Sequence, residues 1–424
     1  MESTEDLIKV VIDKNSKINT ETIKKLLKPM TLISWILSAG ICHPDCSKIT
    51  TIIIRIINLI ICTTIVAYGA LDFFFFENVF KSDTFKIMYY TNKVTCYVSS
   101  YWCVIQGIVQ HKKWPVLVHK MMTIDKKMSR HAFMECNNRL INKFQIFSVI
   151  ITVIMGPFSL ICHVVYYYNI RPEDLFASDL LLYHTIAQSL SMNLYFDIIV
   201  LFIYSRLKGL NSGIKKFHGC SSGTVVLEIR RIREIYGGIC NLVRYVNNIY
   251  GVHLLLSTLN SFTMVVATLF RIYMGVVEDK NIFILINNLI WIIYTIQVTL
   301  NCFVCTFFWL IYLVIYLIIN KVVLVIFYKF RRLSKCPRPY ELYSVDLNRS
   351  CDPEIYLQRE INNFSSQLHH STMSFNACGF FLIDNKLLRS FIGVITTYLI
   401  ILVQFYVPEG KNINKLHTNA TNVS

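Results

Sequence analysis

The stretch 396–405, TTYLIILVQF, closes the last of about seven apolar runs in a chain of 424 residues. It sets uncharged polar side chains, among them Thr397, Tyr398 and Gln404, in otherwise apolar sequence. A polar side chain at membrane depth is costly unless it faces other protein or water. We therefore predict a membrane-spanning helix whose polar side chains line a pore.

The composition of the whole chain is that of a membrane protein. Hydrophobic residues make up 54% of the sequence, charged residues 16%, and the mean hydropathy is +0.47. Soluble domains carry about 25% charged residues, and a spanning helix needs roughly 20 apolar ones. The runs that meet or approach this length are 51–75, 87–110, 143–167, 179–204, 250–276, a long stretch from 282, and 387–407. With no linker or repeat between them, they predict one all-α polytopic membrane protein with seven transmembrane helices.

The net charge of +16 is unevenly distributed along the chain. Basic residues gather between the second and third runs and between the fourth and fifth. They are Lys112, Lys113, Lys120, Lys126, Lys127, Arg130, Arg139 and Lys143, then Arg206, Lys208, Lys215, Lys216, Arg230, Arg231, Arg233 and Arg244. Short loops rich in Lys and Arg stay in the cytoplasm. This pattern predicts a multi-pass plasma-membrane protein with a cytoplasmic N-terminus and an extracellular C-terminus, in contact with lipid and not with nucleic acid.

This topology divides the chain into five segments. Residues 1–50 form a cytoplasmic N-terminal segment with a short apolar helix, interfacial or re-entrant. Residues 51–328 hold transmembrane helices one to six and the basic cytoplasmic loops. Residues 329–386 hold a cytoplasmic loop and a helical anchor, 387–407 form the pore-lining seventh helix, and 408–424 form an extracellular tail.

The stretch after the fifth run is too long for one span. It is apolar from 282 to 328, whereas one helix needs roughly 20 residues. We expect one span that ends near Phe308 and continues as a packed cytoplasmic helix. A second span in this stretch is the alternative, and it would put the C-terminal tail in the cytoplasm.

An amphipathic helix is expected between this stretch and the last span. Apolar residues recur there at helical spacing, among polar ones, at Leu357, Ile361, Phe364 and Leu368. Such a helix is too polar to span and suits a cytosolic anchor. It packs either with its own copies in other subunits or within one subunit, and the periodicity does not separate the two.

The motif content argues against a metal centre and against an enzyme. Cys302 and Cys305 have the spacing of a zinc-ligand pair, but they lie in an apolar run without a second pair. Buried structural thiols are therefore expected, with no metal and no cofactor. No HExxH motif or Gly-rich phosphate loop occurs in the sequence, so we predict a protein that is not an enzyme.

Residues 374–405, SFNACGFFLIDNKLLRSFIGVITTYLIILVQF, resemble the C-terminal signature of the insect gustatory receptor family. That signature is a Thr-Tyr pair, five apolar residues and Gln-Phe, here Thr397-Tyr398 and Gln404-Phe405. The resemblance implies a ligand-gated, non-selective cation channel. It also implies a tetramer, a homotetramer or a heteromer with other gustatory receptors, with the seventh helices around a central pore. The gate would then lie near Gln404 and Phe405.

The spacing of the last helix agrees with a pore. Gly393, Thr397, Ile400 and Gln404 follow one another by four, three and four residues and so share one helix face. Copies of this face would give rings of Thr and Gln separated by an aliphatic ring, without charge and hence weakly selective. The alternative is that Thr397 and Gln404 make hydrogen bonds to other helices of the same subunit.

A small-molecule tastant would bind among the outer halves of the second to sixth spans. Binding pockets combine apolar or aromatic walls with a few polar groups. Candidate pocket residues are Tyr97, Tyr101, His163, His184, Gln188, Asn287, Asn288 and Trp291. Each one alone is equally explained as an interfacial anchor or a packing group, because Tyr and Trp gather at membrane boundaries.

The ligand class is indicated by one position. Sugar receptors of the resembled family usually carry an acidic residue after the Thr-Tyr pair, where this chain has Leu399. We therefore predict a taste receptor for bitter or plant-derived compounds that mediates acceptance or avoidance, with a fructose-type sugar receptor as the alternative. From other classes, a G-protein-coupled chemoreceptor would need an external N-terminus, and a secondary transporter would need internal repeats and broken helices.

Overall fold

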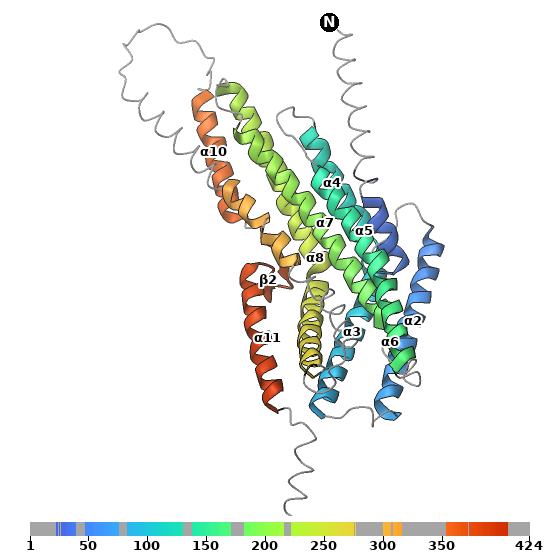
Figure 1. Ribbon diagram of the computed structural model, residues 1–424. Helices are drawn as coiled ribbons and strands as arrows, with labels where there is room; N and C mark the ends of the chain where they lie inside the picture. The colour runs from blue at the N-terminus through green and yellow to red at the C-terminus, as the bar shows by residue number, and fades with distance from the viewer. Residues whose placement is uncertain are drawn as a thin grey trace, which may run out of the picture.

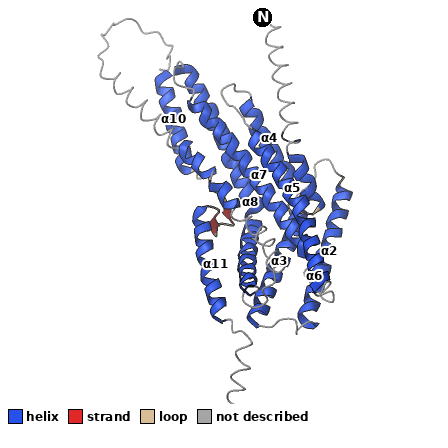
Figure 2. Ribbon diagram, in the orientation of Figure 1, coloured by secondary structure: helices blue, strands red, loops and turns tan. Residues whose placement is uncertain are grey.

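The computed structural model describes residues 23, 25, 27–39, 47–75, 83–129, 138–170, 182–215, 222–274, 276, 300–306, 308–315, 353–371 and 373–405. The described helices form an elongated bundle, and one small hairpin joins the last two of them (Figure 1). Figure 2 shows that this hairpin holds the only strands in the described part of the chain. The predicted all-α class is confirmed.

The helices of the first three predicted spans begin and end close to the bounds of the corresponding apolar runs. The elements are α2 (Lys48–Phe75), α3 (Asp83–Val109), α4 (Lys113–Ser129), α5 (Arg139–Ile150), the π-helical turn η2 (Ile151–Met155), α6 (Gly156–Ile170), α7 (Leu182–Lys215), α8 (Ser222–Met274), α10 (Pro353–His370), β1 (Asn376–Ala377), β2 (Phe381–Leu382) and α11 (Asn385–Phe405). The π turn directly precedes Gly156-Pro157, where proline cannot donate the backbone hydrogen bond of a regular helix.

Four of the described helices are long and apolar enough to cross a membrane: Ile49–Tyr68, Tyr183–Ile214, Val225–Tyr273 and Asn385–Gln404. The predicted second and third spans are also helical, as α3 and as the series α5, η2 and α6. Most of the predicted sixth span lies outside the described residues. The chain is thus a multi-pass membrane-type protein, as its composition predicts.

Helix α7 is the centre of the bundle. Of its apolar window 94% is buried inside the protein, against 22% for α2 and 6% for α11. Helix α2 presents Ile52, Ile56 and Ile60 on its exposed side, as a lipid-facing helix does. Helix α11 stands apart from the bundle on the side of α8 (Figure 1).

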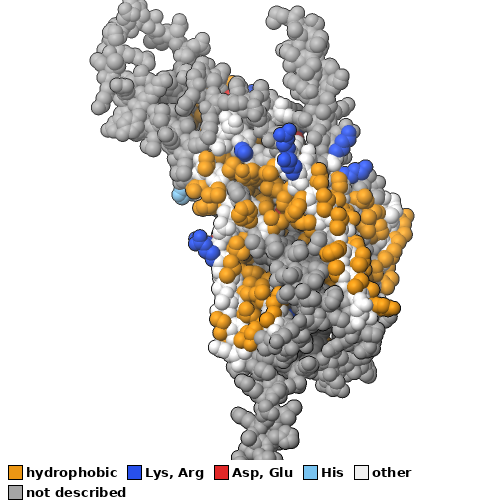
Figure 3. Space-filling model, viewed as in Figure 1, with side chains coloured by type: hydrophobic (Ala, Val, Ile, Leu, Met, Phe, Trp, Pro, Cys, Tyr) orange, Lys and Arg blue, Asp and Glu red, His pale blue; other side chains and the backbone are white. Residues whose placement is uncertain are grey.

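The basic segments are mostly helices and not loops. Helix α4 covers much of the first one, and α7 and α8 extend through much of the second. Helix α8 remains helical there because Ile229, Ile232, Tyr236 and Val243 recur at helical spacing and are buried. In Figure 3 most of the visible Lys and Arg side chains lie above the apolar belt, at the end of the bundle where these extensions project.

The predicted anchor helix forms as α10, and its apolar side packs within the same protomer. Ile361, Phe364 and Leu368 are buried, and the Phe364 ring lies 5.5 Å from that of Tyr236 on α8. The helical segment 308–315 also reaches this region, since Tyr312 Oη donates to Leu368 O at 3.2 Å. Of the two predicted alternatives for α10, packing within one subunit therefore accounts for its apolar face.

Candidate pore helix and its surroundings

Helix α11 carries the predicted pore face on its exposed side. Gly393, Thr397, Ile400 and Gln404 are all exposed, and nothing lies within 4 Å of the place where a Cβ on Gly393 would be. The Thr397 hydroxyl donates to Gly393 O of its own helix at 3.0 Å. Among the described residues, the Thr397 hydroxyl therefore bonds within its own helix and not to another helix of the same subunit. Phe405 closes the helix.

The opposite face of α11 contacts α8. The ring of Phe262 lies 5.8 Å from Phe391 and 5.6 Å from Tyr398, in both cases edge to face. Ile395 is the buried residue of α11 on this side. Because these residues stand about half a turn away from Gly393 and Thr397, the polar stripe points away from the protomer.

The start of α11 is a well-formed helix cap. Asp384 Oδ1 accepts hydrogen bonds from the backbone N–H groups of Lys386 and Leu387, each at 2.9 Å. A carboxylate at this position also interacts favourably with the helix dipole. The helix therefore begins directly at the end of the hairpin that precedes it.

Two predicted pocket residues, His163 and Gln188, bond to partners that were not among the predicted pocket residues. His163 of α6 is buried, and its Nδ1 lies 3.1 Å from the hydroxyl of Tyr183 on α7. Gln188 of α7 is fully buried, donates to Leu37 O at 2.8 Å and accepts from Ser100 Oγ. These two residues join helices, and a structural role explains both of them.

The remaining pocket candidates are less enclosed. Tyr101 of α3 donates to Thr63 of α2 at 3.1 Å on the exposed side. Tyr97 is half-buried on α3. His184 is half-buried on α7, and its Nε2 is a buried atom without a hydrogen-bond partner among the described residues. Asn287, Asn288 and Trp291 lie outside the described residues.

A buried polar cluster that the sequence reading missed joins α7, α8 and the segment 300–306. Asn193 donates to Ser257 Oγ at 2.6 Å, and its Oδ1 lies 3.2 Å from both His253 Nε2 and Asn301 Nδ2. All four residues are buried. Asparagine within an apolar span is the available sequence signal, because buried amides need partners. The cluster lies one helical turn from the fully buried Asp197.

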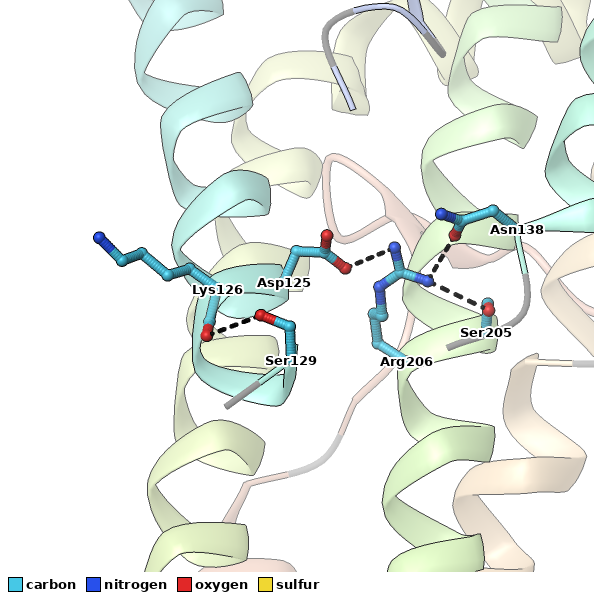
Figure 4. Close-up of polar contacts among 6 residues, drawn as sticks. All are labelled: Asp125, Lys126, Ser129, Asn138, Ser205 and Arg206. Atoms are coloured by element: carbon cyan, nitrogen blue, oxygen red, sulfur yellow. Dashed lines mark hydrogen bonds and ion pairs between the residues drawn. The ribbon is translucent and has the colours of Figure 1, made fainter. Parts of the chain in front are cut away.

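A buried ion pair joins α4 to the C-terminal part of α7 (Figure 4). Arg206 Nη2 lies 2.6 Å from Asp125 Oδ1, and Nη1 donates to Asn138 Oδ1 at 2.8 Å. The guanidinium also stands 4.4 Å from the centre of the Phe202 ring. Burial raises the pKa of the Asp125 carboxyl, and Arg206 acts in the opposite direction. The sequence reading assigned Arg206 to a cytoplasmic loop, yet its side chain is fully buried.

Two short motifs have the residue spacing of chemical sites. Cys302 and Cys305 are buried free thiols, as predicted for structural cysteines. Residues 219–223, GCSSG, spell the Gly-x-Ser-x-Gly pattern of hydrolases, which requires a turn from a strand into a helix. Residues 219–221 lie outside the described residues, Ser222 begins α8, and the strands in the described part of the chain, β1 and β2, come after α8 in the sequence.

Comparisons with known proteins identify the relatives of this fold. The family model described as 7tm Chemosensory receptor matches residues 27–407. “Putative gustatory receptor 2a” of Drosophila melanogaster is 48% identical over 65 residues, 15% of each chain. “Putative gustatory receptor 28b” of the same species is 39% identical over 66 residues, 16% of this chain and 14% of that protein. The matched segment thus spans only about a seventh of the length of these relatives.

Solved structures extend the likeness to the whole fold. The insect olfactory receptor OR5 from Machilis hrabei superposes with a TM-score of 0.59 at 13% identity. Its complex with eugenol superposes with a TM-score of 0.58 at 14% identity. Both comparisons cover 92% of this chain and 100% of the other. At this identity the likeness shows the fold.

The multi-pass helical bundle and the family match define a chemoreceptor of membrane type and not an enzyme. The chain belongs to the 7tm chemosensory receptor family, in which its relatives are insect gustatory and olfactory receptors.

Proposed function

We propose that this protein is a taste receptor of the plasma membrane that acts as a ligand-gated, weakly selective cation channel. Four copies of α11, from one kind of subunit or from several gustatory receptors, would surround a central pore. The observation that carries this proposal is the exposed stripe Gly393, Thr397, Ile400 and Gln404, which faces away from α8, the helix against which α11 packs in the described part of the chain.

Membrane physics supports the placement of this stripe at a pore. Exposed polar side chains on a spanning helix are costly in lipid and are stabilised by water or by other protein. A ring of four Ile400 side chains between Thr and Gln rings is a hydrophobic constriction, and such constrictions gate by dewetting. The segment 391–404 has no charged residue, which supports weak selection among cations.

Bitter or plant-derived compounds are the proposed ligands. Leu399 follows Thr397-Tyr398, where the sugar receptors of the resembled family usually carry an acid. The structural neighbour OR5 binds eugenol, a small aromatic molecule. Both observations favour an apolar, aromatic ligand for this chain over a sugar.

Whole-cell recording tests the proposal. Cells that express the chain are challenged with quinine, denatonium and caffeine, then with fructose and sucrose, while G-protein signalling is blocked. We expect a rapid cation current from at least one bitter compound, and altered gating or permeation in Gln404→Ala and Phe405→Ala. Ile401→Ala is the control, since Ile401 is exposed on α11 but off the predicted pore face.

The outcomes separate the classes of receptor. A ligand response that disappears with the G-protein block contradicts the channel and favours a coupled receptor. A current evoked by fructose alone contradicts the bitter assignment and leaves the channel. Normal permeation and gating in both variants, with surface expression verified, removes α11 from the pore.

A further inference from the structure

The hairpin before α11 is held on α8 by one side-chain amide. Asn247 Nδ2 donates to Ser374 O at 2.8 Å, and Asn247 Oδ1 accepts from the backbone N–H of Asn376 at 3.4 Å. A side-chain amide thus takes the place of a neighbouring strand along β1. Asn247 is half-buried, and both of its polar functions are used by the backbone of the hairpin.

Apolar packing holds the hairpin against other elements as well. Alternate residues Met373, Phe375 and Ala377 are buried, whereas Ser374 and Asn376 are less so, which is the period of a strand. The Phe375 ring lies 5.5 Å from Phe196 of α7 and 4.9 Å from Phe308. The hairpin is thus anchored in the protein on one of its faces.

The turn of the hairpin makes an unusually close approach to α8. A Cβ on Gly251 would lie 3.1 Å from Cys378 Sγ and 3.2 Å from Cys378 N. Gly251 stands one turn after Asn247 on α8, so it continues the same contact surface. Cys378 itself is exposed and has a positive φ of 53°, followed by Gly379 at 80°.

We infer that Asn247 is the positioning residue of the pore helix. It fixes the hairpin 373–383 to α8, and the hairpin passes directly into the Asp384 cap, so the root of α11 has one set place. The root stays on α8 while the remainder of α11 moves in gating. The first statement concerns folding alone, and the second rests on the proposed channel function.

The position of the hairpin can be measured by cross-linking. A disulfide sets the Cβ of one cysteine about 3 Å from the sulfur of the other, close to the 3.1 Å from Gly251 to Cys378. We expect Gly251→Cys to form a disulfide with the native Cys378 in the full chain in detergent under mild oxidation. Mass spectrometry of the linked peptides measures its rate, and added Cys378→Ser removes the product.

Asn247 is then changed in this background. Asn247→Ala should slow cross-linking about fivefold or more, the scale of one net hydrogen bond. Asn247→Asp, which keeps the acceptor and loses the donor, should lie between. The control is Asn248→Ala, an exposed neighbour whose side chain accepts from Lys113 and not from the hairpin. Equal rates in all four proteins overturn the assignment of Asn247, and the Asp variant decides if the Ala variant does not fold.

Recording from Gly251→Cys tests whether the root stays docked. With the tastant panel above, we expect the same current before and after the disulfide is reduced by dithiothreitol. A current that is absent when oxidised and restored by reduction shows that the hairpin must leave α8, and overturns the fixed root. Absence of any current in the unmodified protein bears on the proposed channel, while the cross-linking rates still decide the role of Asn247.

Discussion

Thr396 and Thr397 are neighbours with the same local chemistry. Each hydroxyl donates to the carbonyl four residues earlier, at 2.9 and 3.0 Å. Only Thr397 lies in line with Gly393 and Gln404. A comparison of variants at Thr396 and Thr397 therefore tests the effect of the helix face, because the two side chains are otherwise alike.

A carboxylate at Thr397 should change ion selection. Thr397→Asp would put a ring of negative charge in the proposed pore, and such rings favour cations and attract divalent ones. We expect a larger permeability of Ca²⁺ relative to Na⁺, measured as a shift of the reversal potential. Thr396→Asp should shift it less, and equal shifts in the two variants would contradict the assigned face.

Asp125 and Arg206 should be coupled in stability. Removal of one partner leaves a buried charge alone, which costs about 3–5 kcal/mol. We expect Asp125→Ala and Arg206→Ala each to lower the thermal midpoint strongly, and the double variant to lose less than the sum. The exposed pair Arg230 and Glu234, 3.9 Å apart, is the control and is expected to contribute about 1 kcal/mol or less. Additive losses at Asp125 and Arg206 would argue against coupling.

Single residues differ in how much of their role the sequence reveals. The polar residues of α11 could be predicted because spacing along one helix fixes the face they share. The burial of Arg206 could not, because its partners Asp125 and Asn138 come from distant positions that only the fold brings together. The same holds for Asn193, whose partners lie on two other segments.

At the scale of elements, two glycines of α8 face close neighbours of different kinds. A Cβ on Gly237 would meet the terminal nitrogen of the Gln367 side chain at 2.9 Å, and that side chain can rotate away. A Cβ on Gly251 would meet the backbone of Cys378 at 3.2 Å, in a hairpin already held by Asn247. The effect of a substitution at each glycine therefore depends on whether the neighbouring group can move away.

Alanine at these two positions should therefore have opposite effects. Gly237→Ala should be neutral or stabilising by up to about 1 kcal/mol, because alanine favours helix. Gly251→Ala should destabilise by about 1–3 kcal/mol through overpacking. Thermal unfolding of the purified protein measures both effects. A destabilised Gly237→Ala beside an unaffected Gly251→Ala would reverse this account of the contacts.

Helices of this protein could be predicted better than their ends. The last span and α10 follow from length and from apolar spacing. The extension of α8 through the basic segment could not be predicted from charge, because a run of basic residues also fits a cytoplasmic loop and obscures the helical period of Ile229 and Ile232. The hairpin gives only a short signal, because Met373, Phe375 and Ala377 alternate with polar residues but its strands have two residues each.

At the scale of the molecule, we predict that the N-terminus lies in the cytoplasm and the C-terminus outside the cell. Basic residues lie on the extended ends of α4, α7 and α8, and basic segments stay in the cytoplasm. An epitope tag at the N-terminus should bind antibody only after permeabilisation, and a C-terminal tag should bind it on intact cells. Labelling of the N-terminal tag on intact cells would contradict this orientation and favour a coupled receptor.

Helix α8 has 53 residues without a break and so measures about 80 Å. Asn247 lies close to its midpoint, and Phe262, which touches α11, lies about 22 Å further along. When a rigid helix tilts about its midpoint, the midpoint stays in place and the two ends move. If α8 rocks by about five degrees at this fulcrum, the hairpin stays still while Phe262 travels about 2 Å against the pore helix. Asn247 and Gly251 would then mark the fixed point of α8, and Phe262 would move with the distant half of the helix against α11.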